Sequence, residues 1–132
     1  MILIDSSIWI DWLSSRDTPG TKKLDALLDT PITLFICDRV LQEILQGVRD
    51  DTRIREINKH LSIFECLDTG GIDLARISAE LYRGLRKKGV TIHGSIDVLI
   101  ATLCIEHDLK LLHNDRIFDV IVEHSAMRVE KY

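Results

Sequence analysis

The chain has 132 residues, of which 45% are hydrophobic and 29% charged, and its formal net charge is −4. This balance is that of an ordinary globular protein and excludes a disordered or low-complexity chain, while the length predicts one domain over residues 1–132. The small negative charge argues against a generic nucleic-acid binder that depends on a basic surface, although carboxylates gathered around a metal ion would account for much of it.

Targeting segments and cysteines add two expectations. The N-terminus lacks the basic start and long apolar stretch of a signal peptide, and no apolar run approaches the roughly 20 residues of a membrane span. We therefore expect a cytoplasmic protein. Cys37, Cys66 and Cys104 are odd in number and widely spaced, which predicts small buried thiols rather than a disulfide or a zinc site.

Short apolar runs and segments of helical spacing alternate along the whole chain. A strand at 1–4 precedes a helix at 8–13, for which Ser6 and Ser7 are candidate N-caps, and a helix at 22–29 follows. The later elements, in chain order, are a strand at 32–36, a helix at 40–48 with Asp38 as candidate N-cap, a helix at 53–61, a strand at 63–67, helices at 74–85 and 95–104, a strand at 109–112, a helix at 117–122 and an edge strand at 127–130. This alternation predicts a three-layer α/β/α fold with a central parallel sheet of four to five strands.

Acidic residues fall where such a fold binds ligands, beyond the carboxyl ends of its strands. Asp5 and Asp115 follow two predicted strands, Asp97 lies in the first turn of its helix, and Glu43 lies next to an apolar helical stripe. Carboxylates that converge repel each other, and a half-buried one is costly, unless they are protonated or share a hard cation. The pattern predicts a Mg²⁺ site, with Mn²⁺ as the alternative, built from all four acids.

Each of these acids also has an ordinary explanation when it is considered alone. Asp5 could cap the following helix, Asp97 could stabilise its own helix dipole, and Asp115 could belong to a turn. Glu43 could pair with a lysine or arginine. The four together, at one predicted rim, are a more specific signal than any one of them.

Four segments in order resemble the motifs of PIN-domain proteins, and more narrowly of VapC toxins from type II toxin–antitoxin pairs. They are an apolar strand with Asp and small hydroxyl residues at 2–10, a glutamate helix at 40–47, an aspartate helix at 95–101 and an acidic strand end at 111–118. The chain departs from the pattern in the last segment, where His113 replaces the usual threonine or serine and Ile117 replaces a frequent further acid. This departure puts the binding of a second metal ion in doubt.

The resemblance implies a Mg²⁺- or Mn²⁺-dependent endoribonuclease that cleaves RNA, forms a homodimer and is silenced by a VapB-like antitoxin. Asp5 and Asp97 are expected to be the most direct ligands, with Asp115 holding a water or a second ion. Glu43 is expected to hold a water or accept a proton. Ser6 is expected to bond a carboxylate or the phosphate.

Basic residues cluster near the end of the predicted helix 74–85 and just beyond the Glu43 helix. The first group, Arg83, Arg86 and Lys87 with the neighbouring Lys88, is the favoured candidate for holding RNA phosphates. The second group consists of Arg49, Arg53, Arg55 and Lys59. Either group could instead be a solvated helix face that complements the helix dipole.

Two other functional classes share parts of the pattern. A phosphatase of the haloacid dehalogenase type needs a second aspartate two residues after the first, and Ser7 stands at that position. A non-catalytic RNA- or protein-binding PIN module remains the alternative, because a fold does not by itself fix a function. The presence of all four acids favours the enzyme.

Overall fold

The computed structural model describes all residues from Met1 to Tyr132 and contains one five-stranded sheet in the order β3-β2-β1-β4-β5. The strands are β1 (Ile2–Ile4), β2 (Leu34–Cys37), β3 (Glu65–Leu67), β4 (Lys110–Leu112) and β5 (Arg128–Val129). Every neighbouring pair is parallel. The carboxyl ends of all the strands therefore lie along one rim of the sheet.

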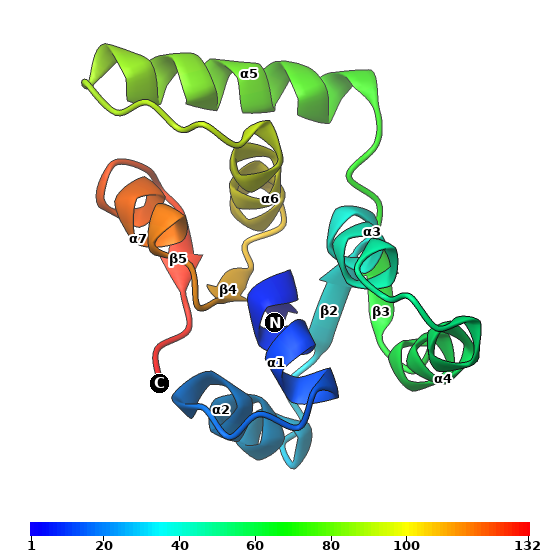
Figure 1. Cartoon of the computed structure of the whole chain (residues 1–132). Coiled ribbons are helices and arrows are strands. Elements are labelled where there is room, and N and C mark those ends of the chain that lie inside the picture. The colour runs from blue at the N-terminus through cyan, green and yellow to red at the C-terminus, as the bar shows by residue number, and fades with distance from the viewer.

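Seven helices cover the sheet. They are α1 (Ser6–Leu13), α2 (Pro19–Leu28), α3 (Asp38–Gln46), α4 (Asp51–Leu61), α5 (Ile72–Lys87), α6 (Ser95–Glu106) and α7 (Arg116–Glu123). α1 contacts α2 and α3, whereas α6 contacts α5 and α7, and Figure 1 shows α5–α7 on one side of the sheet with α1 and α2 on the other. The predicted three-layer α/β/α fold with a parallel sheet is confirmed. None of these helices combines the length and apolarity that crossing a membrane requires.

The centre of the core is β1 with the helices that pack on its two faces. Ile2, Leu3 and Ile4 are all buried, because a strand between two helix layers has no solvent-facing side. Trp9 of α1 is fully buried, and its ring lies edge-on to those of Trp12 and Phe64, with centroids 5.7 and 4.9 Å away. This packing fixes α1, and with it the residues that join β1 to α1.

Three local expectations were wrong. The N-cap of α1 is not Ser6 or Ser7 but Asp5, the ordinary role named above for this aspartate, since its carboxylate accepts the Ser7 backbone N–H. Asp38 lies inside the first turn of α3, and Cys37 takes the N-cap position without a side-chain bond. Cys66 is exposed while the other two thiols are buried, because β3 lies at the edge of the sheet.

Candidate active site

The sheet rim gathers the four predicted acids from separate parts of the chain. Asp5 directly follows β1, and its backbone N–H still donates to Leu112 O of the neighbouring β4 at 2.9 Å. Asp115 follows β4 after two residues, Asp97 lies in the first turn of α6, and Glu43 lies within α3. Asp5 is buried, Glu43 and Asp97 are half-buried, and Asp115 is exposed.

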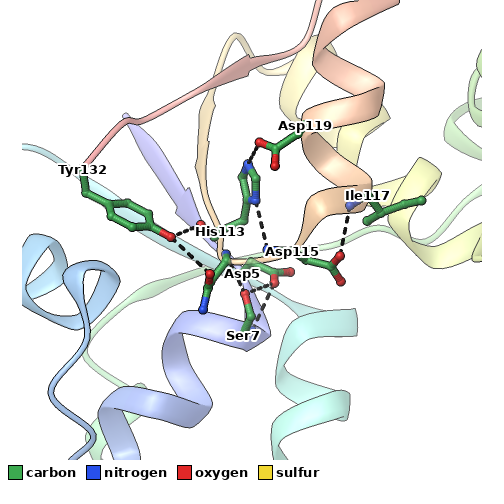
Figure 2. A network of polar contacts seen from close by, with 8 residues as sticks. Asp5, Ser7, His113, Asp115, Ile117, Asp119 and Tyr132 are labelled. Carbon is green, nitrogen blue, oxygen red and sulfur yellow. Dashed lines mark hydrogen bonds and ion pairs between the residues drawn. The ribbon is translucent and has the colours of Figure 1, made fainter.

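Asp5 is held by one of its two carboxylate oxygens. Ser7 donates to Oδ2 twice, from its backbone N–H at 3.1 Å and from its hydroxyl at 2.6 Å. Figure 2 shows these bonds converging on the carboxylate where α1 begins. Oδ1 receives no hydrogen bond from the protein. The capping role that Asp5 has therefore occupies one oxygen and leaves the other available.

The charges of the four acids act on one another. Burial, followed by the charges of Asp115, Asp5 and Glu43 in that order of size, raises the pKa of Asp97 from its usual value of 3.8 to about 6. Burial also raises the pKa of Asp5, against the opposing hydrogen bonds from Ser7 and with a smaller contribution from Glu43. The charges of the neighbouring acids therefore disfavour the ionisation of Asp5 and Asp97.

No basic side chain relieves this repulsion. All six ion pairs of the protein involve other acids. A buried carboxylate without a cationic partner and a cluster of like charges are the conditions that a hard divalent ion relieves, and the ligands on offer are all oxygens. The donor set therefore fits Mg²⁺ or Mn²⁺.

The side chains do not yet converge to ligand distance. As they stand, no three His, Cys, Asp or Glu side chains lie close enough together to hold a metal ion. The Asp97 carboxylate lies back over Gly94, so close that a Cβ there would meet it, and one oxygen of Asp115 accepts the Ile117 N–H at 3.0 Å. Both groups would have to turn from their own helix ends toward Asp5 to share an ion.

His113, which departs from the resemblance, is part of the rim and not an exposed turn residue. Its side chain is 8% exposed, and its ring packs against Phe118 with centroids 5.2 Å apart. Nδ1 accepts the Asp115 backbone N–H at 3.2 Å, and Nε2 lies 3.8 Å from Asp119 Oδ1. His113 therefore fixes the backbone of Asp115, as a short hydroxyl side chain at this position would.

The other residues expected to bind substrate are arranged less tightly. Ser6 is half-buried and its hydroxyl forms no hydrogen bond with the protein, whereas Ser7 binds Asp5. Arg83 lines a mostly apolar hollow of about 350 Å³ between α5 and α6, together with Ser95 and Val98 on either side of Asp97. Arg83 thus shares this hollow with residues that flank Asp97 in the sequence.

The remaining cations are partly engaged elsewhere. Arg86 lies over the Tyr82 ring, 5.8 Å from its centroid, and Lys87 is exposed at the end of α5. Lys88 Nζ donates to His124 O at 2.9 Å. From the second basic group, Arg53 donates to Leu13 O at 2.7 Å and thereby joins α4 to α1.

Three rim residues were missed from the sequence. Ser7, Asn114 and Tyr132 join the C-terminal segment to Asp5 by hydrogen bonds. The spacing of Ser7 two residues after Asp5 is a sequence signal, because an aspartate commonly accepts the N–H of the second following residue. No pattern connects Tyr132 with the rim.

Comparison with known proteins identifies the family of this chain. The family model of the PIN domain matches residues 2–123. The chain belongs to the PIN-domain family. It is 28% identical to VapC ribonuclease Mb1587 of Mycobacterium bovis and to ribonuclease VapC11 of Mycobacterium tuberculosis, each over 133 residues that cover 100% of this chain and 99% of the relative.

Solved structures share the fold over most of this PIN-domain chain. A structure of VapBC2 from Rickettsia felis, bound to a DNA fragment from its promoter, matches with a TM-score of 0.80 and 22% identity, covering 100% of this chain and 99% of that one. VapC20 of Mycobacterium tuberculosis, described as a Sarcin-Ricin loop cleaving toxin, matches with a TM-score of 0.67 and 13% identity over 90% and 93% of the two chains. At these identities the likeness concerns the fold.

Proposed function

We propose that this PIN-domain protein is a divalent-metal-dependent endoribonuclease and the toxin of a type II toxin–antitoxin pair. The observation that carries the proposal is the set of four carboxylates at the sheet rim, without cationic partners, in which the pKa of Asp97 reaches about 6. The names of the two mycobacterial relatives, both ribonucleases, support RNA as the substrate. A non-catalytic PIN module would have no need of this costly cluster.

Asp5 and Asp97 are the proposed principal ligands of Mg²⁺, with Mn²⁺ as the alternative ion. Ser7 holds Oδ2 of Asp5, so that Oδ1 keeps one orientation at the rim. Asp115 can contribute the oxygen that does not cap α7. When bound, a divalent ion supplies polarisation of the scissile phosphate and neutralises the carboxylates.

The remaining groups serve the attacking water and the RNA strand. Glu43 faces the same electrostatic environment as Asp5 and is the proposed proton acceptor for the water. Arg83 beside α6, with Arg86 and Lys87 further along α5, is proposed to hold phosphates that flank the scissile bond. Ser6, whose hydroxyl has no partner within the protein, is proposed to bond the phosphate.

The biological role follows from the proposed activity. Solved relatives include VapBC complexes from Rickettsia felis and Salmonella typhimurium bound to DNA. A VapB-like antitoxin with a basic side chain would be attracted to an acidic rim that has no cation of its own. We also propose a homodimer and a cytoplasmic location, where the RNA substrate is found.

The test is cleavage of total RNA by the purified protein with Mg²⁺, with Mn²⁺ and with a chelator. Asp5→Asn preserves the helix cap, because asparagine caps as well as aspartate, but removes the charge. Asp5→Asn and Asp97→Asn should each lower the cleavage rate by about 1,000-fold, the scale expected for loss of metal-ion catalysis.

Asp29→Asn, at an exposed position after α2, is the matched control and should cleave like the parent protein. Cleavage that persists in both rim variants would refute the metal mechanism. RNA binding without cleavage in either metal would favour the non-catalytic module.

A further inference from the structure

A continuous chain of hydrogen bonds runs from the side chain of Tyr132 to the carboxylate of Asp5. The Tyr132 hydroxyl donates to His113 O at 3.0 Å, and Asn114 N–H donates to Ser7 Oγ at 3.0 Å. The Ser7 hydroxyl in turn donates to Asp5 Oδ2 at 2.6 Å. Figure 2 shows Tyr132 reaching this network from the C-terminal segment, on the side of His113 away from Asp119.

We propose that Tyr132 is a positioning residue, which holds Asp5 in its ligand orientation through the His113–Asn114 peptide group and Ser7. The proposal rests on the metal-binding role of Asp5 proposed above. It assigns a role in the active site to a residue 127 positions away along the chain, since Tyr132 follows Asp5 by that number. Tyr132 touches neither RNA nor metal in this role.

The directions of the bonds make the chain act as a unit. His113 C=O and Asn114 N–H belong to the same peptide group, so a donor on the carbonyl makes the N–H a stronger donor. Ser7 Oγ has one proton, and accepting the Asn114 N–H leaves that proton directed to Asp5. Each link therefore strengthens the next, and the last bond fixes Oδ2.

The side chain of Tyr132 is 52% exposed, with one side of its ring against α2. Its ring lies beside Gly20 at the start of α2, where a Cβ would come within 3.7 Å of the ring. Burial, followed by the charges of Asp119 and Asp11, raises the pKa of Tyr132, so that the phenol keeps its proton at neutral pH. A protonated hydroxyl is what the first link needs, because a phenolate has no proton to donate.

The experiment compares Tyr132→Phe with the parent protein in the full chain. Mn²⁺ affinity is measured by isothermal titration calorimetry without RNA, and kcat and KM for an RNA substrate are measured separately. Removal of the hydroxyl should weaken Mn²⁺ binding by about three- to tenfold, which is less than the roughly 10- to 100-fold typical of a direct partner of a ligand, because Tyr132 acts through two intervening groups. The KM for RNA should stay unchanged, because the RNA contacts are elsewhere.

Tyr82→Phe is the matched control for loss of a phenol hydroxyl, since the Tyr82 hydroxyl has no hydrogen bond in the protein. It should leave the Mn²⁺ affinity unchanged. The double variant Ser7→Ala with Tyr132→Phe should bind Mn²⁺ as Ser7→Ala alone does, because the serine transmits the effect. Thermal unfolding of each variant checks that the fold is retained.

Three results would overturn the proposal. One is Mn²⁺ affinity in Tyr132→Phe equal to that of the parent protein, and another is full additivity of the two substitutions. The third is a loss of activity in Tyr132→Ala that Tyr132→Phe does not share. That result would mean that the ring acts, as a surface for stacking a base, and not the hydroxyl. If Asp5→Asn binds Mn²⁺ and cleaves RNA normally, the failure lies with the proposed function and not with this network.

Discussion

Carboxylates that follow different strands of the one sheet have pKa values shifted in opposite directions. Asp38 follows β2 and Glu130 follows β5, and the pKa of each is lowered. Asp5 follows β1, and its pKa is raised, as is that of Asp97 near the same rim. The residue type and the position in the fold are similar, so the difference comes from the partners that each carboxylate has.

The two acids with lowered pKa values, Asp38 and Glu130, both have hydrogen-bond or ion-pair partners. Lys23 and Lys110 donate to the two oxygens of Glu130 at 2.8 and 2.9 Å and hold its pKa down. Burial acts to raise the pKa of Asp38, but hydrogen bonds from the side chain and backbone of Thr69 and from Arg39 outweigh it. These acids stabilise the fold.

The two acids with raised pKa values lack a partner for their charge: the Asp5 carboxylate accepts hydrogen bonds from Ser7 only, and Asp97 caps no helix. Asp5 and Asp97 have no lysine or arginine in reach, although the chain has 17 such residues. The protein tolerates this electrostatic cost at one place only, which is the expected mark of a site that is built for an external cation.

The largest effect that separates the two groups is expected from Asp97→Asn. Its RNA cleavage should fall by about 1,000-fold, while the metal-free protein should become more stable by about 1 kcal/mol at neutral pH, after allowance for solvent screening of a half-exposed group. The gain arises because the native state no longer holds an unfavourable charge. Urea unfolding in the presence of a chelator measures it, with Asp29→Asn as control.

The pH dependence of Asp97 has a defined sign. A carboxyl whose pKa is raised by folding binds its proton more tightly in the native state, so stability falls as pH rises from the usual 3.8 to about 6. The asparagine variant should lack this part of the decline. Equal slopes for the variant and the parent protein between about pH 4 and about pH 6 would mean that Asp97 does not share the acidic environment.

A second comparison uses the adjacent serines. Ser7→Ala should weaken Mn²⁺ binding by about tenfold, because it removes the 2.6 Å hydrogen bond that orients Asp5. Ser6→Ala should raise the KM for RNA, because a proposed contact with the phosphate is lost. It should leave the Mn²⁺ affinity unchanged, because the Ser6 hydroxyl does not bond the carboxylate. Calorimetry and steady-state kinetics on both variants give the two readouts, and a larger metal defect in Ser6→Ala would reverse the assignment.

The sequence was sufficient for the fold and for the principal acids. The apolar run of β1 ends at Asp5 and that of β4 ends shortly before Asp115, so the parallel topology alone places both at one rim. The apolar helical spacing around Glu43 and the position of Asp97 in the first turn of a helix were also predicted from the sequence. The sequence did not predict which residue caps α1. An aspartate and two serines in succession offer three possible caps, and only the structure shows that Asp5 accepts the hydrogen bond.

The contacts that support the site were outside the reach of sequence patterns. Tyr132 meets His113 across 19 residues, and neither periodicity nor spacing predicts which atom its hydroxyl bonds. The exposure of Cys66 depends on which strand is at the sheet edge, a property of strand order that the alternation of elements leaves open.

The smallest expected effect concerns Glu130, one of the two acids with a lowered pKa. Glu130→Gln should lower the free energy of unfolding by about 1 kcal/mol at neutral pH, because two ion pairs with partly buried lysines are lost. Since the pKa of Glu130 is lowered, its contribution is present above the usual 4.5 and is lost as pH falls through the lowered value. Urea unfolding at neutral and acidic pH checks this, with the exposed Glu106→Gln as control. A Glu130→Gln variant as stable as the parent protein would remove the contrast between the two groups.

The most direct measurement is the anomalous diffraction of a crystal of the protein soaked with Mn²⁺. The account predicts an anomalous peak at the sheet rim, in contact with Asp5 Oδ1 and the Asp97 carboxylate, with both Asp97 and Asp115 turned toward it. No peak at the rim at Mn²⁺ concentrations that support cleavage, or a peak that contacts neither Asp5 nor Asp97, would contradict it.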